Sequence, residues 1–226
     1  MESDVSQLRQ VQALNLRTQI EQEVRDAILR GVFKPGERLP ESVIASQLGV
    51  SRAPVREVLS ALERDGLVVN IPRRGNFVID FSEKDIDEIY SLRLLLEIGA
   101  LHRAFDHFTE KDFEEMQTLV NRLGEADQQN MDPLDVMHID LSFHETIFRV
   151  ADHSRISDIW NRLRMQTQLL IGWTTSTHYS DQPMQLHQQI LDAIRARDLP
   201  AAEAVLRDHI LDGRDRALQQ LSKIRV

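Results

Sequence analysis

Cysteine is absent from the 226 residues of the sequence, which excludes disulfide bonds, thiolate zinc sites and a cysteine nucleophile. Any bound metal ion would therefore need His, Asp or Glu ligands. The sequence also lacks a basic and apolar signal at its N-terminus, and no apolar run approaches the roughly 20 residues that span a bilayer. We therefore expect a soluble, cytoplasmic protein that has no membrane partner.

Basic residues are in the minority, because 27 Lys and Arg stand against 36 Asp and Glu and give a net charge of −9. Such a balance disfavours binding to nucleic-acid phosphates, but the charge is unevenly distributed. Residues 1–80 contain 11 basic and 11 acidic residues, so the remaining 16 and 25 lie in residues 81–226. Five arginines outnumber three acidic residues within 51–76, namely Arg52, Arg56, Arg64, Arg73 and Arg74. A small positive patch is therefore available in the first part of the chain.

The first 80 residues show the pattern of three helices followed by a β-hairpin. Apolar residues recur at helical spacing over 16–28, and Pro40 opens a shorter helix that Gly49 ends. Ser51 can cap a third helix, whose apolar stripe consists of Val55, Val58, Leu59 and Leu62. Two apolar runs, 67–71 and 77–79, flank a turn sequence that carries arginines. This order predicts a winged helix-turn-helix.

Beyond residue 80 the strand signals disappear, and residues that start helices recur along the chain. The pattern predicts six helices, at about 83–107, 110–126, 133–151, 155–174, 181–197 and 199–222. We therefore expect a mainly α protein with two domains. Residues 1–80 would form the winged helix-turn-helix domain, and residues 81–226 an all-helical bundle.

The third predicted helix carries two arginines on the face opposite its apolar stripe. Arg52 and Arg56 are four residues apart, so both can project toward DNA from the start of a recognition helix. The planar guanidinium suits guanine O6 and N7 or a phosphate. Arg73 and Arg74, at the hairpin tip, could reach a neighbouring minor groove or the DNA backbone. The alternative is an ordinary helix corner whose arginines form a solvated face.

The segment PGERLPESVIASQLGVSRAPVREVLSALERDGLVVNIPRRGNFV resembles the winged helix-turn-helix of GntR-type regulators almost from end to end. The resemblance covers about residues 15–80. It implies that operator DNA is contacted by Ser51, Arg52, Arg56 and the wing residues Arg73, Arg74 and Gly75. Some members of the family carry an arginine on the second helix, where this chain has Glu41, Ser42 and Val43.

Four residues of the second part form a candidate metal site. Asp140 and His144 are four residues apart on one predicted helix, and His187 and His209 lie on the last two predicted helices. Three neutral imidazoles and one carboxylate suit zinc, nickel or manganese, with a further position for water or a ligand oxygen. Spacing alone leaves the alternative open, because a single histidine is more often a packed or surface residue.

Three blocks of the second part, DEIYSLRLLLEIGALHRAF, DLSFHETIF and LHQQILDAIRARDLPAAEAVLRDHI, resemble the FCD effector domain of the FadR-like branch of the GntR family. Metal-binding members use an Asp-x-x-x-His helix and two later histidines. The resemblance therefore implies that Asp140, His144, His187 and His209 hold a divalent metal ion. The segment VADHSRI departs from the Gly-Asn common in the family at Asp152-His153.

Arg93 is the candidate residue for binding an effector. Its ordinary interpretation is an ion pair with Glu97, four residues later on the same predicted helix, or a position on a solvated face. In the family an arginine at this point often binds the carboxylate of the effector. A bidentate arginine beside a metal ion would suit a small organic acid.

These features together predict an effector-responsive transcriptional regulator, and we expect a repressor. Its partners would be operator DNA, a small carboxylate metabolite and a second copy of the chain, because one winged helix covers only one half-site. One alternative is a metal-dependent hydrolase with an accessory docking domain, and another is a binding protein whose N-terminal domain docks a partner protein. We do not expect an enzyme, because four protein ligands tend to saturate zinc and no nucleophile or second carboxylate stands at a useful spacing.

Overall fold

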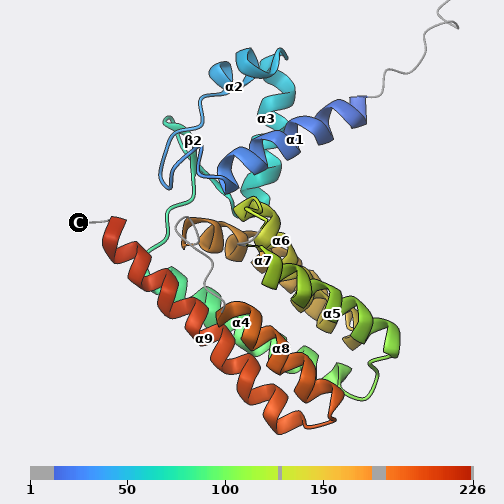
Figure 1. Ribbon diagram of the computed structural model, residues 1–226. Helices are drawn as coiled ribbons and strands as arrows, with labels where there is room; N and C mark the ends of the chain where they lie inside the picture. The colour runs from blue at the N-terminus through green and yellow to red at the C-terminus, as the bar shows by residue number, and fades with distance from the viewer. Residues whose placement is uncertain (1–12, 127–128, 175–181, 225–226) are drawn as a thin grey trace, which may run out of the picture.

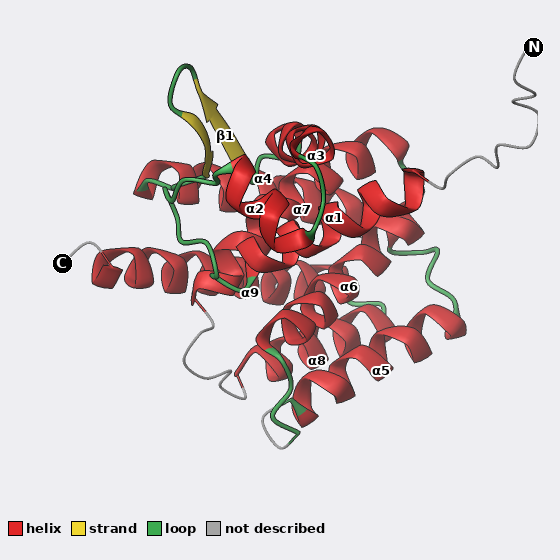
Figure 2. Ribbon diagram, turned by 90° about the horizontal axis from the view of Figure 1, so that it is seen from above, coloured by secondary structure: helices red, strands yellow, loops and turns green. Residues whose placement is uncertain are grey.

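The computed structural model describes residues 13–126, 129–174 and 182–224 of the chain. Figure 2 shows that helices make up nearly all of this structure, with one small hairpin of two strands. The predicted fold class is therefore confirmed. In chain order the elements are α1 (Ala13–Leu29), α2 (Glu41–Leu48), α3 (Arg52–Arg64), β1 (Val68–Ile71), β2 (Gly75–Val78), α4 (Glu83–Ala104), α5 (Glu110–Glu125), α6 (Pro133–Ala151), α7 (Ser154–Thr174), α8 (Gln182–Arg195) and α9 (Leu199–Ile224).

The turn between α2 and α3 is the centre of the N-terminal part. Gly49 has a φ of +66°, which a side chain would strain, and the next amide, that of Val50, donates to the carbonyl of Ala45 at 3.0 Å. Helix α3 then buries five apolar residues against α1 and α2, namely Val55, Val58, Leu59, Ala61 and Leu62. Ser51 occupies the N-cap position of α3 as predicted, but its side chain makes no capping hydrogen bond. The opposite face of α3 stays in solvent.

The hairpin after α3 is antiparallel, with Val68 opposite Val78 and Ile71 opposite Gly75. Its turn is tight because Arg73 and Gly75 both have positive φ values, of 65° and 101°. The backbone amide of Arg74 closes the turn by donating to the carbonyl of Ile71 at 3.0 Å. Figure 2 shows the hairpin extending beyond the neighbouring helices, as the wing of a winged helix-turn-helix does.

Helices α4 to α9 pack on one another as a bundle (Figure 1). Helix α4 contacts α6, α7 and α9, while α5 contacts α6 and α8. Three of the predicted helix starts are confirmed by their caps: Ser82 and Thr109 each form a capping box, and the Asp132 side chain accepts from the amide of Leu134. Helix α4 ends at Ala104, three residues before the predicted end, and buried Phe105 and Phe108 follow it. Residue 181, the predicted start of the fifth bundle helix, lies outside the described residues.

The N-terminal part is joined to the bundle by a close approach of α7 to α1. Gly172 of α7 lies so near the end of α1 that a Cβ there would stand 2.8 Å from the carbonyl oxygen of Leu29. Nearby, Nη1 of Arg25 in α1 donates to the sulfur of Met165 in α7 at 3.4 Å. The two parts therefore meet without a spacer at this point. In the described part of the chain, no helix has the length and apolar character that crossing a membrane requires.

Candidate functional site

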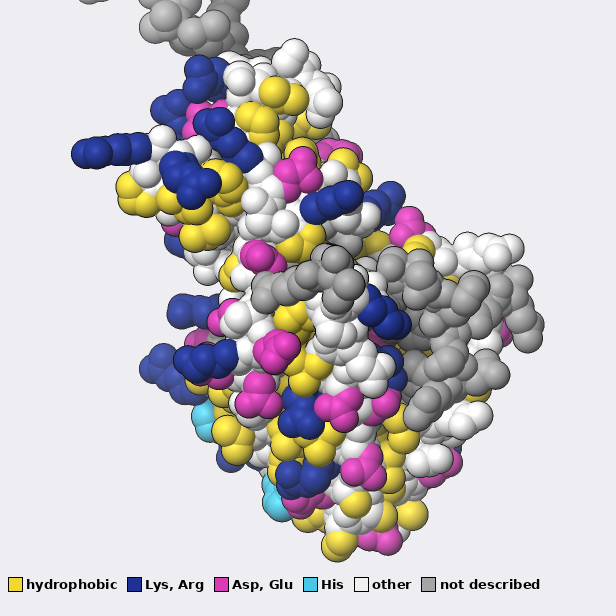
Figure 3. All heavy atoms as spheres, turned by 90° about the vertical axis from the view of Figure 1, so that its left-hand side faces the viewer, with side chains coloured by type: hydrophobic (Ala, Val, Ile, Leu, Met, Phe, Trp, Pro, Cys, Tyr) yellow, Lys and Arg dark blue, Asp and Glu magenta, His cyan; other side chains and the backbone are white. Residues whose placement is uncertain are grey.

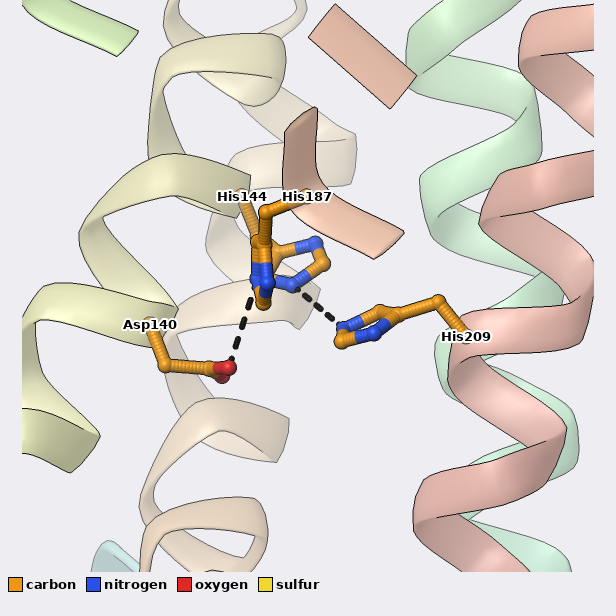
Figure 4. A group of neighbouring side chains, drawn as sticks. All are labelled: Asp140, His144, His187 and His209. Atoms are coloured by element: carbon orange, nitrogen blue, oxygen red, sulfur yellow. Dashed lines mark hydrogen bonds and ion pairs between the residues drawn. The ribbon is translucent and has the colours of Figure 1, made fainter. Parts of the chain in front are cut away.

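The bundle brings together the four predicted metal ligands. Asp140 and His144 project from α6, His187 from α8 and His209 from α9, and Figure 4 shows their side chains converging between these helices. One potential ligand atom from each residue lies within 4.8 Å of the others. All four side chains are buried, with His144 and His187 at 0% relative exposure. Helix α6 therefore supplies two of the four predicted ligands, and α8 and α9, which are distant in sequence, supply one each.

Two short distances define the centre of this cluster. Nε2 of His144 lies 3.1 Å from Nε2 of His209, and Nε2 of His187 lies 3.3 Å from Oδ1 of Asp140. Phe143 stands edge-on to His187, with ring centroids 4.8 Å apart, and shields it from solvent. Three imidazoles and one carboxylate that face one another this closely in a dry interior form a donor set that could hold a divalent cation.

The electrostatic setting keeps the imidazole of His209 neutral. Burial is the main cause that lowers the pKa of His209 well below its ordinary value of 6.5, and the closeness of His187 and His144 lowers it further. A neutral imidazole has a lone pair to offer, so it is the form that binds metal ions. Among the described residues, Nδ1 of His209 has no hydrogen-bond partner.

Glu97 of α4 lies directly behind His144. Its Oε2 is 2.6 Å from Nδ1 of His144, and its Oε1 accepts from Nε of Arg93 at 2.5 Å. Burial by itself would raise the pKa of Glu97, but the charge of Arg93, followed by the contact with His144, lowers it to about 2. The two groups are close but not aligned as a hydrogen bond. A carboxylate beside Nδ1 favours the neutral tautomer that carries its proton on Nδ1, and this tautomer leaves the lone pair of Nε2 facing the cluster.

Sequence reasoning missed this role of Glu97. The spacing of four residues from Arg93 pointed to an ion pair, but nothing in the sequence connected Glu97 with His144 on another helix. The sequence signal available was that Glu97 and Arg93 are the two charged residues of an otherwise apolar helical run, residues 92–98.

Arg93 forms the ion pair with Glu97 that was the alternative interpretation of its position, and it is buried, with 2% relative exposure. Its Nη2 has no hydrogen-bond partner within the described part of the chain. The guanidinium also lies 6.0 Å from the ring centroid of Trp160 in α7. The ion pair therefore occupies the Nε atom of Arg93, and Nη2 has no partner within the described part of the chain. The role of Arg93 in effector binding stays a prediction.

The predicted DNA-contacting residues are accessible at the other end of the molecule. Arg52 and Arg56 begin α3 with 63% and 64% of their side-chain surface exposed. At the hairpin tip Arg73 and Arg74 are exposed, and the Arg74 guanidinium lies 5.4 Å from the centroid of the Phe77 ring. Figure 3 shows basic side chains gathered on the upper part of the molecule, where α2, α3 and the hairpin lie.

The sequence matches two protein-family profiles. The family described as "Bacterial regulatory proteins, gntR family" matches residues 16–78, and the "FCD domain" family matches residues 88–212. The first covers α2, α3 and the hairpin, and the second contains all four residues of the His/Asp cluster together with Arg93 and Glu97.

A relative and two solved structures agree with these matches. The gluconate operon transcriptional repressor of Bacillus subtilis is 33% identical over 78% of this chain and 74% of its own length. The fold is similar to that of McbR/YncC from E. coli, with a TM-score of 0.78 and 23% identity over 91% of this chain and 98% of that one. A GntR regulator from Rhodococcus sp. RHA1 has a TM-score of 0.76 and 26% identity over the same shares.

Proposed function

The chain is a transcriptional regulator that belongs to the GntR family and carries an FCD domain, and from this premise we propose that it is a metal-dependent, effector-responsive repressor. Residues 1–80 would bind operator DNA and residues 81–226 would bind a divalent metal ion and a small organic acid. The observation that carries this proposal is the buried convergence of Asp140, His144, His187 and His209 beside Arg93.

The metal part of the proposal rests on the fit of the donor atoms. Two donors that each lie about 2.1 Å from one ion are about 3.0–3.4 Å apart in octahedral or tetrahedral geometry. The distances of 3.1 Å between His144 and His209 and of 3.3 Å between His187 and Asp140 lie in this range. The four donor atoms together lie within 4.8 Å of one another, so the wider pairs would move closer by a few tenths of an ångström to the about 4.2 Å that separates opposite donors on one ion. The donor types suit zinc, nickel or manganese, and a bound ion would supply buried positive charge for an anionic ligand.

The effector part rests on a second cation, Arg93, which is connected to His144 of the cluster through Glu97. Nη2 of Arg93 is buried and has no partner among the described residues, so it can donate to a carboxylate oxygen. The Nε atom of the same guanidinium already donates to the Glu97 carboxylate. A ligand with one or two carboxylates would satisfy Nη2 and the metal ion together, whereas a neutral ligand would leave charge uncompensated.

The DNA part assigns base contacts to Ser51, Arg52 and Arg56, and wing contacts to Arg73, Arg74 and Gly75. The exposure of both α3 arginines supports this assignment. One winged helix covers one half-site, so we propose a homodimer on a near-palindromic operator. The effector would then act by preferring one arrangement of the two DNA-binding domains and shifting the population toward it.

The hydrolase alternative is set aside on family grounds, because the homologues and structural neighbours are transcriptional regulators and not enzymes. The decisive experiment is a thermal-shift screen of small organic acids against the full chain, performed once with added zinc, nickel or manganese and once with chelator. We expect an acid that stabilises the protein only with metal present and that changes its affinity for operator DNA. If no acid stabilises the metal-loaded protein, the proposed effector class is wrong.

A further inference from the structure

Glu41, the first residue of α2, lies against both exposed arginines of α3. Nε of Arg56 donates to Oε1 and Oε2 of Glu41 at 3.2 Å each, and Nη2 of Arg56 donates to Oε2 at 3.0 Å. Nη2 of Arg52 lies 3.5 Å from the same Oε2. One carboxylate is therefore shared by the two side chains that the proposed function assigns to base contacts.

The burial of the three side chains shows which part of this group is fixed. The Glu41 side chain keeps only 19% of its surface exposed, whereas Arg52 and Arg56 keep 63% and 64%. The hydrogen bond from Arg56 is the main cause that lowers the pKa of Glu41, so its carboxylate is charged at neutral pH. The Glu41 carboxylate is therefore the fixed, partly buried member of the three, while the two arginine side chains extend into solvent.

The contacts leave the recognition edge of Arg56 available. A guanidinium has five N–H donors, and Glu41 engages the edge formed by Nε and Nη2. The two Nη1 hydrogens and the second hydrogen of Nη2 remain for the end-on, two-bond contact that arginine makes with guanine O6 and N7.

We propose that Glu41 is a positioning residue that sets the sequence specificity of DNA binding by holding Arg56, and secondarily Arg52, in the orientation that reads a base. This inference rests on the proposed DNA contacts of the two arginines. Because the side chain is already held before binding, it loses less conformational entropy when it contacts a base. The carboxylate also cancels one of the two positive charges, so it weakens attraction to phosphates of any sequence. Both effects increase the ratio of specific to nonspecific affinity.

A purely structural role makes a different prediction. An acidic residue in the first turn of a helix also interacts favourably with the helix dipole, and Glu41 has this position in α2. That role needs only the negative charge, and its loss would change the stability of the protein rather than the choice of DNA sequence.

The test measures the full chain by fluorescence anisotropy on two duplexes, over a series of salt concentrations. The first duplex is the one that the wild-type protein enriches from a random-sequence pool, and the second has the same bases scrambled. The variants are Glu41→Gln, which removes the charge, and Glu41→Asp, which keeps the charge but shortens the side chain. Glu63→Gln, at an exposed position of α3, is the matched control for lost charge.

We expect Glu41→Gln to bind the scrambled duplex several-fold more tightly, with a salt dependence steeper by up to about 0.9 for one additional phosphate contact. Its specificity ratio should fall about tenfold, as for a weakened bidentate base contact. Glu41→Asp should keep the wild-type salt dependence but lose specificity, because its carboxylate cannot reach Arg56 as closely. Glu63→Gln should keep the wild-type ratio.

The proposal is overturned if both Glu41 variants melt normally and keep the specificity ratio within about twofold of the wild-type value. Replacement of Arg52 and Arg56 together by Ala separates this outcome from failure of the proposed function. If that double variant binds the selected duplex as the wild type does, the base-contact role of the arginines is wrong. If it loses binding while the Glu41 variants keep their specificity, only the role of Glu41 is wrong.

Discussion

Oε2 of Glu97 lies 2.6 Å from Nδ1 of His144, which places a buried carboxylate behind a proposed metal ligand. Glu97→Gln should therefore weaken metal binding about 10–100-fold, the usual effect of losing such an outer partner. The measurement is a metal titration of the folded apo-protein by calorimetry. Glu88→Gln, at an exposed position on the same helix, is the control and should bind metal normally. An unchanged affinity in Glu97→Gln would show that His144 does not depend on this carboxylate.

Metal removal should lower the thermal midpoint of the wild-type protein. Because a bound ion stabilises only the folded state, metal at 100 times its Kd contributes about 2.7 kcal/mol, or roughly 5–10 °C for a chain of this size. We expect about one ion per chain by elemental analysis, and His144→Ala should lose both the ion and the chelator effect. His102→Ala, which removes an exposed histidine outside the cluster, should retain both. Absence of metal after incubation with zinc, nickel or manganese would refute the site.

Arg52→Ala and Arg56→Ala should each weaken binding to the selected duplex by roughly 1–3 kcal/mol without changing the fold. The reason is that both side chains are exposed at the start of α3 and would lose direct base contacts. Anisotropy titrations measure the loss, and circular dichroism checks the fold. Arg122→Ala, an exposed position on α5, should bind DNA as the wild type does. Normal footprints from a folded Arg52→Ala/Arg56→Ala variant would contradict the assignment.

Arg93→Lys should reduce the response to the organic acid while preserving the fold. Replacement by Ala would leave the Glu97 charge buried without its cation, at a cost of about 3–5 kcal/mol. Lysine keeps a positive charge there but lacks the fork that lets one edge bind Glu97 and another bind a ligand. We expect the acid concentration needed for a given thermal shift to rise at least about tenfold, with metal content unchanged. Arg103→Lys on the same helix is the control and should respond to the acid as the wild type does. A wild-type response in Arg93→Lys would contradict the effector role.

Asp112→Asn should destabilise the protein by roughly 1–2 kcal/mol at neutral pH, because Asp112 completes the capping box of α5 and accepts from Arg149 of α6. Although burial raises the pKa of Asp112, hydrogen bonds from Thr109 and Arg149 lower it below its ordinary value of 3.8. A group whose pKa is lowered by folding stabilises the protein above its unfolded pKa and loses that contribution as the pH falls through the folded pKa. Urea unfolding should show the difference between variant and wild type narrowing below about pH 4. A difference that stays constant would exclude the charge of Asp112 as its cause.

The sequence predicted those features that depend on neighbours within one turn. The starts of α4 and α5 were predictable because Ser82 and Thr109 each pair with an aspartate three residues later. Asp140 and His144 were placed on one face by the same local logic, but bringing His187 and His209 to them required the resemblance to a known family. The contact of Glu97 with His144 joins two helices, and that of Glu41 with Arg56 spans 15 residues. Neither contact follows from periodicity, because both depend on how the helices pack.

The close approach at Gly172 makes α7 a tightly packed link between the bundle and the N-terminal part. Near its C-terminal end, Gly172 lies against the carbonyl of Leu29, the last residue of α1, with no space for one additional carbon atom. Toward its other end, Trp160 stacks on Phe148 of α6 and lies beside Arg93, which is bound to Glu97 behind His144. Packed interiors have little free volume and transmit displacement. Because a Cβ at position 172 would overlap the carbonyl of Leu29, any residue larger than glycine there would force α7 and α1 apart and shift the N-terminal part relative to the bundle.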